Sequence, residues 1–208
     1  MGERGSLRDL VYNVQEIDFI PEDAALVGVG LDFGFSHDPT AVIGVYKRDG
    51  DLYFDELIYE RGLTNFDLIE KLKEIGLDKR VDIVADSADP KSIEELRRVG
   101  YAVKPAMKGP DSIRNGIDIL KRYKLFVTKE SHNLVVEFNR YKWRKDSAGN
   151  MLNQPVDVWN HGQDAIRYVA LNMLKIKQQN TFNISIVGND GRAIRQTGGQ
   201  GQGRYSIR

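Results

Sequence analysis

The 208-residue sequence contains no cysteine, which excludes disulfide bonds, thiolate metal sites and cysteine nucleophiles. It has no apolar run near the roughly 20 residues that a membrane-spanning helix needs, and no signal-peptide pattern at its start. Its 30 basic and 30 acidic residues give a formal net charge of zero, which argues against a uniformly basic nucleic-acid-binding protein. We therefore expect an ordinary globular protein that works in the cytosol.

Positive charge is nevertheless concentrated in one part of the chain. Between residues 104 and 145 basic side chains clearly outnumber acidic ones, and the candidates for contact with a DNA backbone are Lys108, Arg140, Lys142 and Arg144. The last three alternate with Tyr141 and Trp143, an arrangement that suits phosphate contact together with base stacking. A solvated helix face would equally explain the excess of positive charge, and a hairpin with one apolar face would equally explain the alternation. Each alternative stays open beside DNA contact.

Hydrophobic patterns predict an α/β fold with a mixed sheet. Apolar runs over residues 26–33, 41–46 and 51–59, the last two joined by the turn Asp49-Gly50, predict an antiparallel three-strand meander. Helices then alternate with strands: helices over 65–75 and 90–99 and from 111, 131 and 160, and strands over 81–86, 101–104 and 125–127. A hairpin is expected over 141–158. The order is that of a ribonuclease H-like sheet flanked by helices.

Two further segments complete the predicted organisation. Residues 1–25 show no clear periodicity and are interpreted as a lead-in or linker, and residues 26–177 as the folded domain. Residues 178–208 are rich in Gly, Gln and Arg, which predicts a largely disordered tail, although 181–187 could form a strand. In the first predicted helix we expect Phe66, Ile69, Leu72 and Ile75 to share one face.

Three aspartates lie where they could meet at one edge of the sheet. Asp32 ends the first buried strand, Asp86 ends the strand over 81–86, and Asp164 lies in the first turns of the last helix, with His161 three residues earlier. Carboxylate oxygens suit a hard cation such as Mg²⁺ or Mn²⁺. Two such ions about 3.5 to 4 Å apart can orient a water and stabilise the leaving oxygen of a phosphodiester. The pattern thus predicts a metal-dependent phosphodiesterase.

Each of these residues also has a purely structural interpretation. Backbone amides of the turn over residues 34–40 could satisfy Asp32, and Asp38-Pro39-Thr40 is interpreted as shaping that turn. Asp86 could cap the helix that begins at Pro90, and His161 could be a packed or capping histidine. Acidic residues such as Asp164 are common in a first helical turn.

Three motifs in order resemble the nuclease domain of tailed-bacteriophage large terminases. They are Leu31-Asp32-Phe33-Gly34 with Asp38-Pro39-Thr40-Ala41, then Ala85-Asp86-Ser87-Ala88-Asp89-Pro90, then Asn160-His161-Gly162-Gln163-Asp164-Ala165. The intervening Lys108-Gly109-Pro110-Asp111 also fits. Each motif is weak alone, but the ordered set is specific and covers about residues 26–174.

This resemblance implies a ribonuclease H-like endonuclease that cuts concatemeric double-stranded DNA at the start and end of genome packaging. It implies Asp32, Asp86 and Asp164 as ligands of two Mg²⁺ or Mn²⁺ ions, with His161 as a further catalytic member. The partners implied are DNA, a terminase ATPase domain, the portal and the small terminase. The implied location is the cytoplasm of the infected bacterium and, transiently, the procapsid portal.

The sequence departs from full-length terminases because it contains no Gly-x-x-x-x-Gly-Lys-Ser/Thr phosphate loop. We therefore expect a nuclease domain without its motor. A resolvase or ribonuclease H of the same fold is the nearest alternative. An actin-like or sugar-kinase-like ATPase would need further nucleotide motifs that are absent from the sequence. A non-catalytic DNA-binding or docking module is the alternative from another class, and dependence on metal separates it from the nucleases.

Overall fold

The computed structural model describes residues 9–34, 36–156, 158, 160–174, 185–187 and 193–195. The chain divides into two compact units, residues 1–175 and 176–208. In the second unit, β10 (Ser185–Val187) pairs antiparallel with β11 (Ala193–Arg195). The strand expected over 181–187 is therefore present in its last three residues, and β11 is a further strand within the predicted tail. The other residues of that tail lie outside the described residues.

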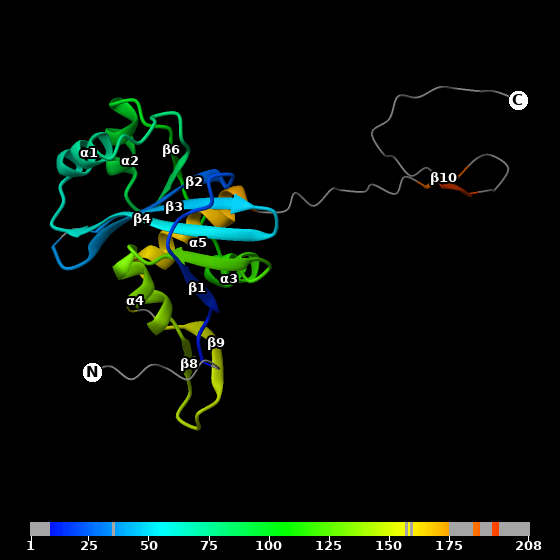
Figure 1. Cartoon of the computed structure of the whole chain (residues 1–208). Helices are drawn as coiled ribbons and strands as arrows, with labels where there is room; N and C mark the ends of the chain where they lie inside the picture. Colours follow the sequence, from blue (N-terminus) through cyan, green and yellow to red (C-terminus); the bar gives the residue numbers. More distant parts are fainter. Residues whose placement is uncertain are drawn as a thin grey trace, which may run out of the picture. The chain divides into compact units, whose positions relative to one another are not determined.

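The first unit is built on a seven-stranded sheet with the order β1-β7-β4-β3-β2-β5-β6 (Figure 1). β3 runs antiparallel to both β2 and β4, and the remaining neighbours pair in parallel. The strands are β1 (Val14–Ile17), β2 (Ala25–Asp32), β3 (Pro39–Arg48), β4 (Asp51–Arg61), β5 (Ile83–Ala85), β6 (Val103–Pro105) and β7 (Lys124–Thr128). The predicted meander and mixed sheet are confirmed.

Five helices cover the two faces of this sheet within the described residues. One hydrophobic cluster joins the sheet to α1 (Asn65–Glu74) and α2 (Pro90–Arg98). A second joins the opposite face to α3 (Ser112–Leu120), α4 (His132–Arg140) and α5 (His161–Met173) (Figure 1). None of the described helices is long and apolar enough to cross a membrane.

Helix α5 lies directly on β2. A Cβ atom added at Gly30 would stand 2.0 Å from the carbonyl oxygen of Ala165, and one at Gly28 would stand 2.7 Å from Met173 Sδ. At Gly30, where the neighbour is backbone, only a residue without a side chain allows so close an approach. Because the start of α5 lies over the end of β2, the fold carries the first turn of α5 to the carboxyl ends of β2 and β5.

The structure corrects the interpretation of the N-terminal segment. Val11 and Tyr12 are buried in the core, and β1 extends the sheet by pairing in parallel with β7. The ring of Tyr12 stacks on that of Tyr141, with centroids 6.0 Å apart. Residues 10–17 are therefore part of the domain and not a linker.

The predicted face of α1 is correct in its middle, at Ile69 and Leu72, and wrong at its two ends. Phe66 and Ile75 are 70% and 45% exposed, whereas Leu68, Ile69 and Leu72 are buried. Residues spaced by three drift by about 60° per step around a helix of 3.6 residues per turn, so the run from Phe66 to Ile75 crosses from one side to the other.

Candidate metal centre

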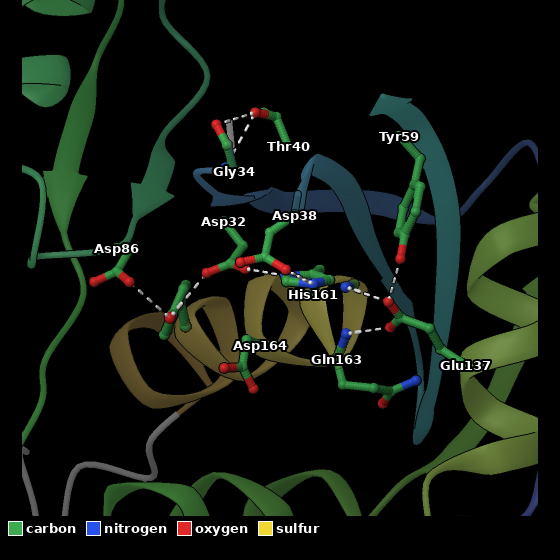
Figure 2. Close-up of polar contacts among 12 residues, drawn as sticks. Asp32, Gly34, Asp38, Thr40, Tyr59, Asp86, Glu137, His161, Gln163 and Asp164 are labelled. Carbon is green, nitrogen blue, oxygen red and sulfur yellow. Dashed lines mark hydrogen bonds and ion pairs between the residues drawn. The ribbon is translucent and has the colours of Figure 1, made fainter. Parts of the chain in front are cut away.

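A cleft of about 1000 Å³ opens at the carboxyl ends of β2 and β5. Residues from the sheet, from the loops that follow it and from the first turns of α5 line it. Among them are all the predicted catalytic residues, Asp32, Asp86, His161 and Asp164. Figure 2 shows these side chains around the start of α5. β2 and β5 are parallel neighbours, with Leu31 opposite Ala85, so the topology brings Asp32 and Asp86 to one edge as predicted.

Asp32 is the last residue of β2 and is only 8% exposed. Its Oδ1 accepts a hydrogen bond from the Tyr168 hydroxyl at 3.1 Å, and its Oδ2 lies 3.1 Å from His161 Nδ1. The hydrogen bond with Asp32 raises the pKa of His161, although burial opposes the shift. Side chains of α5 therefore satisfy the buried carboxylate, and among the described residues of the following turn no backbone amide donates to it.

Asp86 follows β5 directly and forms an ion pair with Lys108, with 2.5 Å between Nζ and Oδ1. The Ala88 amide donates to the same oxygen at 2.7 Å, and the Tyr168 hydroxyl donates to the other at 3.4 Å. Burial raises the pKa of Asp86, but the Lys108 ammonium and these donors outweigh it and hold the pKa below its usual value. Asp89, not Asp86, caps α2.

Asp164 lies in the first turn of α5 and forms an ion pair with Arg167 of the next turn. Burial raises the pKa of Asp164 despite the guanidinium, and the charge of Asp32 raises it further. Both burial and the negative charge of Asp32 therefore disfavour the ionised form of Asp164. A cation placed between the carboxylates would relieve both costs.

The donor set fits a hard divalent cation, because it consists of carboxylates that repel one another in a half-buried cleft. As the side chains stand, no group of three or more Asp, Glu or His residues in the described part of the chain is close enough together to hold a metal ion. Lys108 and Arg167 neutralise Asp86 and Asp164 in that arrangement. Side-chain rotation would have to release these cations before both carboxylates could bind metal.

The structure separates the predicted basic residues into two groups. Lys108 lines the cleft, with its ammonium 5.5 Å from the centroid of the Tyr168 ring. The lining of the cleft does not include Arg140, Lys142 or Arg144, which follow or end α4 or lie in β8 (Trp143–Lys145). β8 forms the predicted hairpin with β9 (Met151–Pro155).

Tyr141 is not available for base stacking, because only 1% of its surface is exposed. Trp143 is half-buried and contacts Lys121, whose ammonium lies 4.8 Å from the indole centroid. The hairpin with one apolar face is therefore the interpretation that fits Tyr141.

Sequence reasoning missed several residues that shape the site. Tyr168 bridges Asp32 and Asp86, and its position one helical turn after Asp164 was the available signal. Asp38, interpreted as shaping the turn, also reaches the cleft, where its Oδ1 lies 3.6 Å from His161 Nε2. Thr40 of the same segment holds the turn as expected, since its hydroxyl accepts from the Gly34 amide and donates to the Gly34 carbonyl (Figure 2).

Comparison with known proteins identifies the family. A family model described as the terminase RNAseH like domain matches residues 32–171, which include the whole predicted triad. The chain belongs to this terminase family. The resemblance predicted from the three motifs is thereby confirmed, and so is the ribonuclease H-like fold.

Relatives of this terminase domain differ in length. The PBSX phage terminase large subunit of Bacillus subtilis (strain 168) is 30% identical over 142 residues, which are 67% of this chain and 33% of that protein. The chain therefore spans about a third of this relative. The nuclease domain of g2p, the large terminase of bacteriophage SPP1, was solved with bound Mn. It has a TM-score of 0.68 and 26% identity, covering 77% of this chain and 97% of that one.

A more distant structure shares the fold alone. The large terminase nuclease of thermophilic phage G20c, solved with bound magnesium, has a TM-score of 0.54 at 17% identity and covers 74% of this chain and 84% of that one.

Proposed function

We propose that this terminase domain is a divalent-metal-dependent endonuclease that hydrolyses phosphodiester bonds of double-stranded DNA in the cleft. The observation that carries the proposal is that Asp32, Asp86 and Asp164, from three separate elements, line one cleft in a chain of this family. The Mn and magnesium bound to the SPP1 and G20c domains support the choice of cation.

Asp32, Asp86 and Asp164 are the residues that would hold Mg²⁺ or Mn²⁺, and two ions are expected. The bound cations would supply Lewis acidity, lowering the pKa of a water and neutralising charge on the phosphate. Tyr168 and His161 orient Asp32 through both of its oxygens. Lys108 and Arg61 are the lysine and arginine among the described residues that line the cleft, and both can contact phosphate oxygens.

The biological role proposed for the chain follows from its relatives. Cutting of concatemeric DNA at the start and end of genome packaging is proposed, with a terminase ATPase domain, the portal and the small terminase as partners. The corresponding location is the cytoplasm of an infected bacterium and, transiently, the procapsid portal.

Cleavage of supercoiled plasmid DNA tests the enzymatic proposal. With Mn²⁺ or Mg²⁺ the domain should nick and linearise plasmid with little sequence preference, and excess EDTA should stop it. Asp32→Asn and Asp86→Asn should each reduce cleavage by at least about 100-fold. Asp78→Asn is the matched control, because Asp78 is an exposed aspartate paired with Arg80 outside the cleft. Cleavage that persists in EDTA, or a folded Asp32→Asn variant with full activity, would refute the proposal.

A further inference from the structure

Helix α4 carries a buried carboxylate that points at the start of α5. Glu137 is 1% exposed. Its Oε1 accepts hydrogen bonds from the Gly162 amide at 3.1 Å and from the Tyr59 hydroxyl at 2.7 Å. Its Oε2 accepts one from the Gln163 amide at 3.0 Å. Figure 2 shows Glu137 between Tyr59 of β4 and the first turn of α5. One carboxylate thus joins three elements.

Through these contacts Glu137 caps the N-terminus of α5. The first amides of a helix have no partner within the helix, and a negative charge there is favourable. Asn160 stands at the N-cap position of α5 but makes no side-chain cap hydrogen bond. Glu137 supplies the missing acceptors from a neighbouring helix. The side chain that caps the start of α5 therefore comes from α4.

Gly162 makes this approach possible. A Cβ atom at that position would lie 2.7 Å from Leu134 Cδ1 and 3.0 Å from Glu137 Oε2. A side chain would therefore push α4 away from α5 and lengthen both amide–carboxylate hydrogen bonds. Capping of α5 by Glu137 therefore depends on glycine at position 162.

The turn that Glu137 holds is the turn that carries site residues. His161 and Asp164 flank the two capped amides, and Glu137 itself is not among the residues that line the cleft. Asp32 and Asp86, in contrast, are placed by the sheet. The geometry of the cation site therefore depends on how α5 is set against the sheet.

We propose that Glu137 is a positioning residue for the cation site, acting through the first turn of α5 to set Asp164 and His161 against Asp32. This inference rests on the proposed function, because it assumes that these side chains bind a divalent cation. Polar groups that orient metal ligands without touching the metal are general features of such sites, and losing one typically weakens metal binding by about 10- to 100-fold.

Two substitutions of Glu137 distinguish an effect of its hydrogen bonds on the position of α5 from an effect of its negative charge. Glu137→Gln keeps the size of the side chain but turns an amide NH₂ toward an N–H donor. Glu137→Asp keeps the charge but shortens the side chain by one methylene, so that it no longer reaches all three donors. Glu56→Gln is the matched control, because Glu56 of β4 accepts from the Leu134 amide and Asn133 Nδ2, both at 2.7 Å, and so caps α4 instead.

Amide hydrogen exchange of the metal-free protein is the first readout. Both Glu137 variants should exchange the Gly162 and Gln163 amides at least about tenfold faster than the unsubstituted protein. Glu56→Gln should leave those two amides unchanged. Equal exchange in all four proteins would overturn the proposal, whether or not the domain is a nuclease.

Calorimetric titration with Mn²⁺, well below the unfolding temperature of every variant, is the second readout. Both Glu137→Gln and Glu137→Asp should weaken Mn²⁺ binding by about tenfold or more, and Glu56→Gln should not. Weaker binding in Glu137→Gln alone would mean that the buried charge acts at a distance, which overturns positioning. If the unsubstituted protein binds no Mn²⁺, the proposed function fails, while hydrogen exchange still decides whether Glu137 anchors α5.

Discussion

Replacing Lys108 with glutamine should tighten the binding of a divalent cation. The Lys108 ammonium lies 2.5 Å from Asp86 Oδ1, on a carboxylate that we propose as a metal ligand. In the metal-free protein this ion pair stabilises Asp86, and an incoming cation must displace it. Glutamine keeps most of the length of the side chain but removes the positive charge. The substitution therefore raises the free energy of the metal-free state and lessens repulsion in the metal-bound state.

The expected size follows from the geometry and exposure of the pair. Unit charges about 3 Å apart attract by about 5 kcal/mol at an effective dielectric constant of 20. The side chains of Lys108 and Asp86 are 41% and 20% exposed, so water screens the pair strongly. We therefore expect about 1 kcal/mol, which is close to the value of a partly exposed ion pair. That corresponds to about a fivefold increase in Mn²⁺ affinity.

Calorimetric Mn²⁺ titration of both proteins measures this change directly. Lys104→Gln is the matched control, because Lys104 forms a similar ion pair with Asp82, 2.7 Å long, outside the cleft. Urea unfolding in EDTA should show the same free energy as a loss of stability in Lys108→Gln. Unchanged or weaker Mn²⁺ binding by this variant would refute the reasoning. If its affinity for DNA fell instead, Lys108 would be a phosphate contact, as the sequence first suggested.

The pH dependence of folding stability is an independent test of the ion pair between Lys108 and Asp86. The pKa of Asp86 is lowered from its ordinary value of 3.8, so the folded protein binds this proton less tightly than the unfolded chain. The ion pair contributes its full stabilisation of the folded state above the pKa that Asp86 has in the unfolded chain. This stabilisation is lost as the pH falls through the lower pKa of Asp86 in the folded protein. The stability difference between the unsubstituted protein and Lys108→Gln should therefore be largest near pH 7 and vanish in strong acid.

Three further experiments test other parts of the structure. Tyr168→Phe removes the hydroxyl that bridges Asp32 and Asp86 and should lower the metal-free unfolding free energy by about 1 kcal/mol, measured in urea with EDTA; no loss would mean that water replaces the hydroxyl. Gly30→Ala should destabilise the domain by about 3 kcal/mol, because its Cβ would meet Ala165, whereas Gly50→Ala, with open space around it, should be neutral in the same assay. Joint substitution of Lys142 and Arg144 by alanine should weaken DNA binding and reduce the slope of log K against log salt by about 1 to 2, and an unchanged slope would exclude phosphate contacts there.

Most of the sheet could be predicted because most of its strands have a recognisable local sequence pattern. The meander of β2, β3 and β4 is marked by apolar runs and by the Asp49-Gly50 turn. β1 could not be found in this way, because it is four residues long and its burial pattern shows no alternation. Its pairing with β7 depends on a segment more than a hundred residues further along the chain. Short edge strands of this kind are set by tertiary packing and not by local pattern.

The residues of the candidate site likewise fall into those with a local sequence signal and those without one. Asp32, Asp86 and Asp164 could be predicted because each stands at the end or start of an element, and the topology of the sheet then brings those ends together. Glu137 carried no such mark, since an acidic residue on an amphipathic helix ordinarily faces solvent. Its contact with the start of α5 exists only because Gly162 lets two helices approach closely. Sequence patterns thus locate groups that line a cleft, whereas the groups that fix their geometry emerge from the packing between elements.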